Sequence, residues 1–344
     1  GVARAVPGAE LEVLSISFRG PTYRLPARKG NYPVAPKLLA LFCWFQWWAA
    51  GRKLLMSMLK KPADWHTGKP ACVLSAGSSL APVNLILARS LGCCSVVIMT
   101  PSLVPLSLFD LAIIPYHDWL RHRVRRDNIV VTLGAPSNID RKTLEEEKRT
   151  FGQQIGIFRY SEIVGVLLGG NDQNYRLSPG WLKKFLAGLQ SYSRERRVGF
   201  VFTTSRRTPE DVVQYLKQEL ARWENVLYEE YPGKGVRQSH YPGILACSEL
   251  LLVTEDSINM ISESVSSGRK VVIVGVERKK KRLIFDRTIE QMCQKGYAHY
   301  IPESELERLG LYLTESLRCT FQTLNEAERC AQKILQVCQS RRFC

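Results

Sequence analysis

Short runs of aliphatic residues alternate along the chain with longer segments in which apolar positions recur every three or four residues. The short runs, rich in Val and Ile, predict buried strands, and the longer segments predict amphipathic helices. In the first half the predicted strands are Leu11–Ser17, Ala71–Leu74, Ser95–Met99, Leu111–Ile114 and Asn128–Thr132, and the predicted helices are Leu38–Lys60 and Ala81–Leu91. Strands that alternate with helices favour a parallel sheet with helices on both faces.

A polar, charge-rich stretch, Asp140–Gln154, interrupts this alternation before the same pattern begins again. The second half predicts helices Pro179–Arg194, Pro209–Trp223 and Asn325–Gln339 and strands Ile163–Leu168, Val198–Thr203, Asn225–Tyr228, Leu250–Val253 and Val271–Val276. A chain of 344 residues has the length of two ordinary domains. We therefore predict an α/β protein with two Rossmann-like, doubly wound parallel-sheet domains facing a cleft. The expected boundaries are residues 1–150, residues 151–320 and a C-terminal helix over residues 321–344.

The most informative segment follows the predicted strand Leu250–Val253 and consists of a polar turn, Thr254-Glu255-Asp256-Ser257, and a helix. Such turns lie at the carboxyl edge of a parallel sheet, where α/β proteins bind ligands, and the helix start presents N–H groups to a phosphate. Ser257 is either the N-cap of this helix or an anion ligand. Met260 and Glu263 follow at steps of three and share roughly one face, where Glu263 either accepts from ribose hydroxyls or is solvated.

Two more loops of the second domain follow predicted strands. In Gly169-Gly170-Asn171 the glycines allow a ligand to approach the backbone closely, although the spacing is neither GxGxxG nor that of a Walker motif. In Thr204-Ser205-Arg206-Arg207 hydroxyls and guanidiniums precede a helix that starts at Pro209, a combination suited to a diphosphate. The alternative for this loop is a capped helix with solvated arginines.

The first domain also carries polar residues where predicted strands end. Gly77-Ser78 stands between a strand and a helix, so its backbone amides are placed to meet an anion or an acceptor, and Gly134 ends a later strand. His117 follows another strand and stands beside Asp118, a carboxylate that can orient its ring, which makes it the best-placed general base among the five histidines. A structural role is the alternative for this histidine.

Composition narrows the classes of partner. The net charge of +16 favours nucleotides, acidic lipid headgroups or nucleic acid, but no RNA- or DNA-recognition signature is present. The basic runs Arg121–Arg126 and Arg278–Arg282 either approach acidic headgroups or form solvated loops.

The ten cysteines form no CxxC pair or metal-like cluster and indicate a reducing compartment, so we expect no metal site. The chain starts at Gly1 without a charged-then-apolar leader, and we expect a cytoplasmic protein.

One segment has the composition of a membrane contact. Pro36–Ala50 is a dense apolar run with Lys and Arg at its two ends, and it is shorter than the roughly 20 apolar residues that cross a bilayer. Trp44, Trp47 and Trp48 suit the headgroup region, which predicts a peripheral contact with an anionic membrane surface. A buried helix that covers the sheet is the alternative.

Five segments together resemble the mitochondrial fission, or elongated-mitochondria, protein family: FDLAIIPYHD, TLGAPSNI, LLGGNDQNYRLS, FTTSRRTP and VTEDSINMISESVSSGRKVVIV. The resemblance runs in order from about Val73 to Val276, and its most specific positions are Thr254, Asp256, Ser257, Met260 and Glu263. The Gly-rich loop that usually follows the first strand of the family is absent, which indicates a truncated amino terminus.

The resemblance implies a two-domain fold similar to that of the GT-B glycosyltransferases. In those relatives the second domain holds a nucleotide-sugar, with its phosphates at a helix amino terminus and its ribose on a glutamate, so Ser257 would serve the phosphates and Glu263 the ribose. No metal or other cofactor is implied, because a helix dipole and basic side chains can stabilise the leaving diphosphate. Acceptors of such enzymes are often lipid-linked.

Two hypotheses follow from the residues and the resemblance. The first is a glycosyltransferase with a nucleotide-sugar donor, in which Arg206 and Arg207 contact the diphosphate and His117 or Asp118 is the base. The second is a non-catalytic adaptor, because plant members of the family act at the mitochondrial surface through a dynamin-like partner. An epimerase is less favoured, because neither a dinucleotide fingerprint nor a Tyr-x-x-x-Lys pair occurs in a suitable context.

Overall fold

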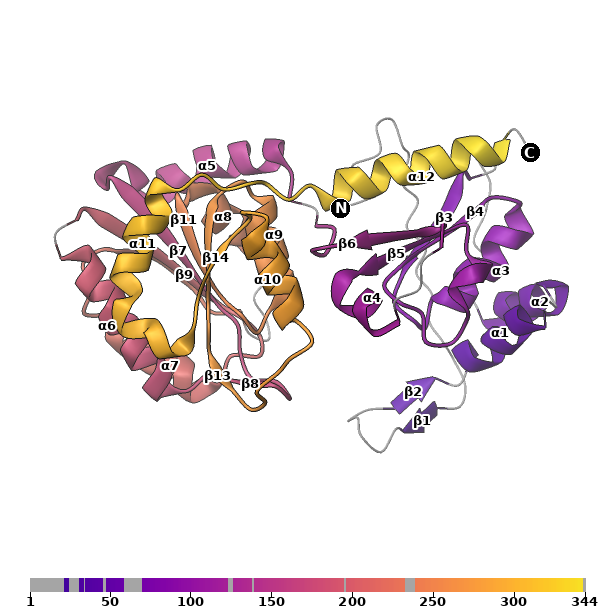
Figure 1. Cartoon of the computed structure of the whole chain (residues 1–344), viewed down its shortest axis with the longest axis horizontal. Coiled ribbons are helices and arrows are strands. Elements are labelled where there is room, and N and C mark those ends of the chain that lie inside the picture. Colours follow the sequence, from indigo (N-terminus) through magenta and orange to yellow (C-terminus); the bar gives the residue numbers. More distant parts are fainter. Residues whose placement is uncertain are drawn as a thin grey trace. The chain divides into compact units, whose positions relative to one another are not determined.

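The structure is a computed structural model, and the chain divides into two compact units (Figure 1). The six-stranded unit contains residues 133–326, and the four-stranded unit contains residues of the range 2–132 together with 327–344. The described residues are 22–24, 31–33, 35–45, 48–58, 70–122, 126–137, 139–194, 196–232 and 239–342. The predicted strand Leu11–Ser17, Trp47 and residues 123–125 of the first basic run lie outside them.

The six-stranded unit is built on one parallel sheet in which the strand order reverses. Its strands are β7 (Glu162–Leu168), β9 (Val198–Thr204), β10 (Val226–Glu230), β11 (Leu250–Thr254), β12 (Lys270–Val274) and β14 (His299–Ile301). Their order across the sheet is β10-β9-β7-β11-β12-β14, and every neighbouring pair is parallel. The first three strands therefore extend from β7 in one direction and the last three in the other. The switch point of this doubly wound sheet lies between β7 and β11.

Both faces of this sheet are covered because the strands are apolar at nearly every position. Val164, Val166 and Leu168 of β7 point into one core and Ile163 and Leu167 into the other. The first core is closed by α6 (Pro179–Ser193), α7 (Glu210–Leu220) and α11 (Leu309–Arg318); the second by α5 (Arg141–Ile155), α8 (Tyr241–Cys247), α9 (Ile258–Ser266) and α10 (Asp286–Gln294).

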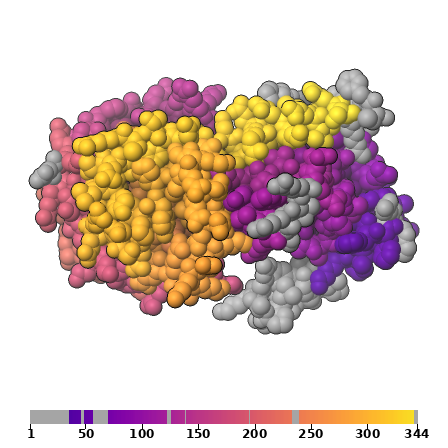
Figure 2. Space-filling view, in the orientation of Figure 1, coloured from indigo at the N-terminus to yellow at the C-terminus, as the bar shows by residue number. Residues whose placement is uncertain are grey.

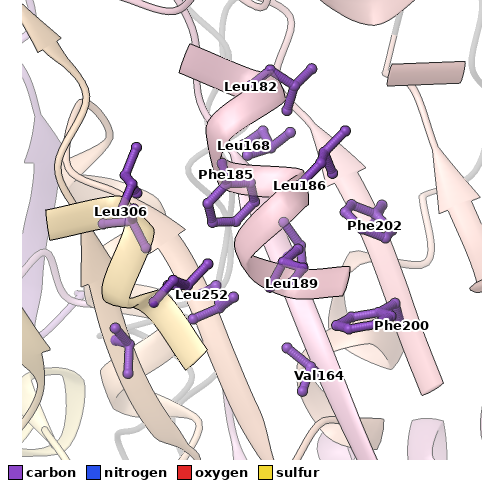
Figure 3. Packing of buried hydrophobic residues seen from close by; sticks show 14 of the residues in the cluster. Val164, Leu168, Leu182, Phe185, Leu186, Leu189, Phe200, Phe202, Leu252 and Leu306 are labelled. Atoms are coloured by element: carbon purple, nitrogen blue, oxygen red, sulfur yellow. The ribbon is translucent and has the colours of Figure 1, made fainter. Parts of the chain in front are cut away.

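Figure 3 shows how closely the first core is packed. One side of α6 is apolar, and its residues lie over the neighbouring strands: Leu182, Phe185, Leu186 and Leu189 over Val164, Leu168, Phe200, Phe202 and Leu252. The helix starts where Ser178 accepts a hydrogen bond from the Trp181 N–H at 3.2 Å. A short antiparallel pair, β8 (Tyr175–Arg176) with β13 (Glu277–Arg278), lies outside the main sheet.

The four-stranded unit has a parallel sheet whose described strands follow each other in sequence order. They are β3 (Cys72–Ala76), β4 (Cys94–Ile98), β5 (Leu111–Pro115) and β6 (Ile129–Thr132). Helices α1 (Ala35–Trp44), α2 (Trp48–Met58) and α3 (Ala81–Leu91) pack on one face, and α12 (Glu326–Arg342) packs on the other. The short helix α4 (Tyr116–His122) follows β5, and β1 (Thr22–Arg24) pairs with β2 (Asn31–Pro33).

The predicted fold class, α/β with parallel sheets, is confirmed, but the units divide the chain differently from the expected boundaries. The polar stretch after residue 140 forms α5, whose Leu144 and Phe151 belong to a core of the six-stranded unit. The C-terminal helix packs on the four-stranded unit through Cys330 and Ile334. The single helix predicted over Leu38–Lys60 is two helices, α1 and α2.

Candidate functional site

Three loops of the six-stranded unit meet where the strand order reverses. The loop Gly169–Asp172 follows β7, the loop Ser205–Thr208 follows β9, and the turn Glu255–Ser257 follows β11. All three strands are parallel, so these loops share the carboxyl edge of the sheet. The structure thus brings together the loops that the sequence predicted separately.

Asp256 is the centre of this arrangement. Its side chain is buried, with the residue only 6% exposed, and Oδ2 accepts a hydrogen bond from the Gly170 N–H at 2.8 Å. The Arg207 guanidinium pairs with the same oxygen at 3.0 Å. Next to it, the Gly169 N–H donates to Thr254 Oγ1 at 2.7 Å. Burial raises the pKa of Asp256, and the Gly170 N–H, Thr254 and Arg207 oppose this rise because they stabilise the carboxylate.

The two glycines are explained by these contacts. A Cβ at residue 169 would overlap the Asp256 carboxylate, and a Cβ at residue 170 would overlap the Arg207 backbone. The sequence predicted close approach of a ligand here, and the structure shows close approach of the protein's own groups. Because both glycine N–H groups bond to Thr254 and Asp256, they stabilise the join between the loops.

The β9 loop is fixed by further bonds. Asn171 N–H donates to the Arg207 carbonyl at 3.1 Å, and Ser205 N–H donates to Thr208 Oγ1 at 2.9 Å. Thr208 Oγ1 in turn donates to the Gly169 carbonyl. Arg207 also lies 3.7 Å from Asp172 Oδ2, so one guanidinium bridges two carboxylates. Arg206 is exposed, and no ion pair is recorded for it in the described part of the chain.

Helix α9 presents its amino end at the same edge. Ser257 is the N-cap residue, and its side chain makes no capping bond. The N–H groups in the first turn of a helix have no carbonyl of that helix to donate to, and they carry the positive end of the helix dipole. Ser257 and these N–H groups therefore form a start suited to an anion.

Met260 and Glu263 lie further along α9. Met260 packs partly against the second core, so it contributes apolar packing. Glu263 lies beside the Tyr241 phenol of α8; burial raises the pKa of Glu263, and Tyr241 lowers it in part. The pKa of Tyr241 is raised well above its ordinary value by burial and by Glu263. Nothing in the spacing of the sequence joins residues 241 and 263, so Tyr241 was not predicted.

Glu255, the neighbour of Asp256, points away into a separate buried network. Its carboxylate accepts from the Val276 N–H at 3.1 Å, from Tyr300 Oη at 3.0 Å and from the Arg278 guanidinium. Arg278 also lies 3.0 Å from Asp286. This first residue of the second basic run is therefore an internal partner that anchors the β11–α9 turn. No local pattern marks Glu255, because its partners are at least 21 residues away along the chain.

Lys279 and Lys280 continue this run against the β7 loop. Lys279 Nζ donates to the Asp172 carbonyl at 2.7 Å, and Lys280 Nζ to Asn174 Oδ1 at 3.3 Å. Both are exposed. The run thus brings positive charge next to the loops of the candidate site.

The remaining predicted residues are placed by other contacts. Gly77 has φ +89° and open space around an added Cβ, and Ser78 Oγ lies 2.5 Å from Ser102 Oγ. Gly134 belongs to the six-stranded unit, where an added Cβ would meet Ser262 of α9. The predicted acceptor-side loop at Gly134 therefore packs on α9.

His117 and Asp118 stand in the first turn of α4, with His117 Nε2 3.8 Å from Asp118 Oδ1. Burial lowers the pKa of His117, Arg121 lowers it further, and Asp118 opposes both. A histidine with a lowered pKa is neutral at pH 7 and can accept a proton. Within the described residues no group of three or more His, Cys, Asp and Glu side chains is arranged to hold a metal ion.

Comparison with known proteins identifies relatives and a shared fold. An uncharacterized protein, RP120, of Rickettsia prowazekii is 25% identical over 301 residues, which cover 77% of this chain and 79% of that protein. The mitochondrial fission protein ELM1 of Arabidopsis thaliana is 27% identical over 198 residues, covering 52% of this chain and 45% of that protein. The chain thus matches less than half the length of the Arabidopsis protein.

Among solved structures, UDP-GlcNAc 2-epimerase from Methanocaldococcus jannaschii superposes with a TM-score of 0.53 at 14% identity, covering 88% of this chain and 82% of that one. At this identity the likeness shows the fold, which is of GT-B type. The sequence model described as Mitochondrial fission ELM1 matches residues 1–338. The chain therefore belongs to the mitochondrial fission ELM1 family.

Proposed function

We propose that the six-stranded unit binds a nucleotide-sugar at the carboxyl edge between β7 and β11, and that the protein transfers the sugar to an acceptor hydroxyl. The observation that carries the proposal is the amino end of α9 at the switch point, with the Ser257 hydroxyl making no capping bond. Parallel sheets bind ligands at such points, and helix starts bind phosphate.

The contacts already made within the protein determine which groups remain for the ligand. Gly169, Gly170 and Arg207 bond to protein groups, so we assign the diphosphate to Ser257, to the first-turn N–H groups of α9 and to Arg206. Asp256 and Arg207 then position the turn. We assign the ribose hydroxyls to Glu263, because its carboxylate has acceptor positions besides the one facing the Tyr241 phenol; it lies on α9, roughly 9 Å along the helix axis from Ser257.

In the transfer step the acceptor oxygen forms a bond to the anomeric carbon, and the bond from that carbon to the diphosphate breaks. The electron pair leaves with the diphosphate, and the α9 dipole and Arg206 stabilise the negative charge that develops. The acceptor proton passes to a general base, for which His117 stays the candidate named from the sequence, since burial lowers its pKa and favours the neutral imidazole.

A second candidate function is favoured by the same contacts. Because three of the predicted phosphate-binding groups are bonded within the protein, the edge offers a nucleotide fewer contacts than the sequence suggested. An adaptor that recruits a dynamin-like partner, the alternative drawn from the resemblance in the sequence, needs no nucleotide at all.

Isothermal titration with a panel of nucleoside diphosphates separates the two. We expect saturable binding of one nucleotide and roughly tenfold weaker binding by Glu263→Ala, because a hydrogen bond to a charged group contributes about 1.5–3 kcal/mol. Glu290→Ala, an exposed carboxylate on α10, is the matched control and should bind as the wild type does. Absence of binding across the panel would leave the adaptor as the better account.

Product analysis then distinguishes the chemistry. Incubation with the matching nucleotide-sugar and a lipid-linked acceptor should release the nucleoside diphosphate together with a glycosylated acceptor. A change in sugar stereochemistry without an acceptor would instead indicate epimerisation, the activity named for the solved structure with this fold.

A further inference from the structure

Helix α1 has two apolar faces, and only one of them packs into the four-stranded unit. Ala35, Leu39, Ala40 and Cys43 are buried in its core. The opposite face carries Leu38, Leu41 and Trp44, and Phe45 follows directly after the helix; the four residues are 43%, 52%, 58% and 62% exposed. We call these four residues the α1 ridge. Their spacing of three, three and one places them along one side of the helix.

The α1 ridge is unusual for this protein. In the described part of the chain the other exposed large hydrophobic residues are Met99, Phe158 and Leu311, which lie apart in the loop after β4, in a short 3-10 turn and in α11. Scattered exposed apolar residues are common, whereas a contiguous group on one helix marks an interaction surface. Figure 2 shows the α1 and α2 segments, in indigo, at the molecular surface.

Trp44 is held in place on this surface. Its indole N–H donates to the Leu103 carbonyl at 2.9 Å, so its polar atom is satisfied within the protein while more than half of the residue stays exposed. An indole fixed in this way presents an apolar ring without the cost of a buried, unpaired N–H. The ridge is therefore formed before any partner arrives.

The charged residues of the segment that contains the ridge indicate what covers it. Residues 35–58 contain Lys37, Arg52 and Lys53, all exposed, and no Asp or Glu. An apolar ridge in a segment whose charged residues are all basic matches the interface of an anionic bilayer, where acyl chains lie beneath phosphate groups. None of the helices in the described residues is long and apolar enough to cross a membrane. A helix of 10 residues, about 15 Å long, fits in the plane of the interface.

We propose that the α1 ridge inserts into the interfacial region of an anionic phospholipid bilayer, with Lys37, Arg52 and Lys53 on the headgroup phosphates. The surface differs from the one expected from the sequence. Trp48 packs partly against the core of the four-stranded unit, and Leu38, Leu41 and Phe45 supply the apolar contact together with Trp44. The inference goes beyond nucleotide binding and does not depend on it.

Vesicle co-sedimentation of the full chain tests the proposal with a matched pair of variants. Leu41→Asp with Phe45→Asp changes the ridge. Leu311→Asp with Phe158→Asp changes a leucine and a phenylalanine that are 59% and 78% exposed in the six-stranded unit. Both pairs lower the net charge by the same amount, so they differ only in position.

We expect the wild type to bind vesicles of phosphatidylcholine with phosphatidylglycerol more tightly than vesicles of phosphatidylcholine alone. The ridge pair should bind the anionic vesicles at least roughly tenfold more weakly, and the control pair as the wild type does. The milder Leu41→Ala with Phe45→Ala should show a smaller loss in the same direction, with an unchanged circular dichroism spectrum.

Three outcomes would overturn the proposal: no binding of the wild type to either vesicle, equal loss in the ridge and control pairs, or loss of self-association in the ridge pair with vesicle binding retained. The last, measured by light scattering, would identify the ridge as a contact between copies of the chain.

Discussion

The six-stranded and four-stranded units use the same alternation of strand and helix but arrange it differently. In the six-stranded unit β7 and β11 are neighbours, and the helices after them, α6 and α9, pack on opposite faces of the sheet. The loops after β7 and β11 therefore diverge. In the four-stranded unit the described strands follow each other in sequence order, so neighbouring loops do not diverge in this way. A sheet of parallel strands offers a ligand site where its order reverses.

The polar residues of the two units differ accordingly. At the switch point of the six-stranded unit, Asp256 and Glu255 are buried with Arg207 and Arg278 as partners. The four-stranded unit has a contact between two hydroxyls, Ser78 with Ser102, and the half-buried His117 beside Asp118. This difference supports the proposal that a nucleotide binds to the six-stranded unit.

The largest expected effect tests whether the two units unfold separately. It concerns α12, which completes the four-stranded unit although it follows the six-stranded unit in sequence. Ile334→Asp puts a carboxylate in the core beneath the sheet, and we expect a loss of about 4 kcal/mol in the unfolding free energy of the four-stranded unit. Hydrogen exchange by peptide should show the loss there and not in the six-stranded unit. Gln332→Asp, exposed on the same helix, is the control, and equal loss in both units would contradict the division.

Two glycine substitutions compare the loops directly. Gly170→Ala makes a Cβ meet the Arg207 backbone, which cannot move alone, and should cost about 3 kcal/mol of unfolding free energy. In Gly77→Ala the added Cβ meets open space, so the substitution should cost only the penalty of the positive φ, about 1 kcal/mol of unfolding free energy. Urea unfolding followed by fluorescence measures both. A larger loss at Gly77 would show that the switch-point loops are not closely joined.

The two adjacent arginines have different expected roles. Arg207→Ala leaves Asp256 buried without its ion pair and should lower the unfolding free energy by about 2 kcal/mol, since Arg207 itself is 40% exposed. Arg206→Ala should change stability by less than about 0.5 kcal/mol but weaken nucleoside diphosphate binding. Thermal unfolding and titration of both variants provide the comparison. If Arg206→Ala binds as the wild type does, the diphosphate assignment is wrong.

The smallest effect is a difference in pH dependence. Burial raises the pKa of Glu162, Asp256 and Glu263, so the folded six-stranded unit binds protons more tightly than the unfolded chain and gains stability as pH falls toward the ordinary carboxyl pKa. Burial lowers the pKa of His117, so its contribution in the four-stranded unit is lost as pH falls below the ordinary histidine pKa.

Hydrogen exchange measured by peptide as pH is lowered should therefore show opposite changes in stability in the two units. Glu263→Gln should reduce the gain in the six-stranded unit, and His117→Gln should reduce the loss in the four-stranded unit. Parallel changes that neither variant alters would contradict the assignment of these groups.

Much of the fold was predictable because its strands are fully apolar runs and its helices have clear starts. The predicted helix Ala81–Leu91 has the bounds of α3, and the predicted strand Ile163–Leu168 differs from β7 by one residue. The three-residue strand His299–Ile301 was missed, since a short strand has too few positions to show a period. The helix Leu309–Arg318 was also missed. The placement of α12 depends on contacts between distant residues, which no local pattern records.

The site was predictable at the level of loops and not of contacts. Gly169, Gly170 and Asp256 were predicted because of their residue types and their places after strands. The structure joins Gly170 to Asp256, 86 positions away along the chain, and only this contact shows that the glycines make room for Asp256. The partners of Glu255 and the approach of Tyr241 to Glu263 also arise from tertiary structure. Sequence patterns indicate on which face of a helix or strand a residue lies, whereas hydrogen bonds between loops depend on the order of the strands in the sheet.

Hydrogen exchange of the full chain with and without a saturating nucleoside diphosphate tests directly whether a nucleotide binds at the switch point. Binding there should add protection in peptides that contain residues 205–208 and 255–263, and none around Gly77 or His117. Protection confined to the loops of the four-stranded unit, or no protection with any nucleotide, would contradict a nucleotide site at the switch point.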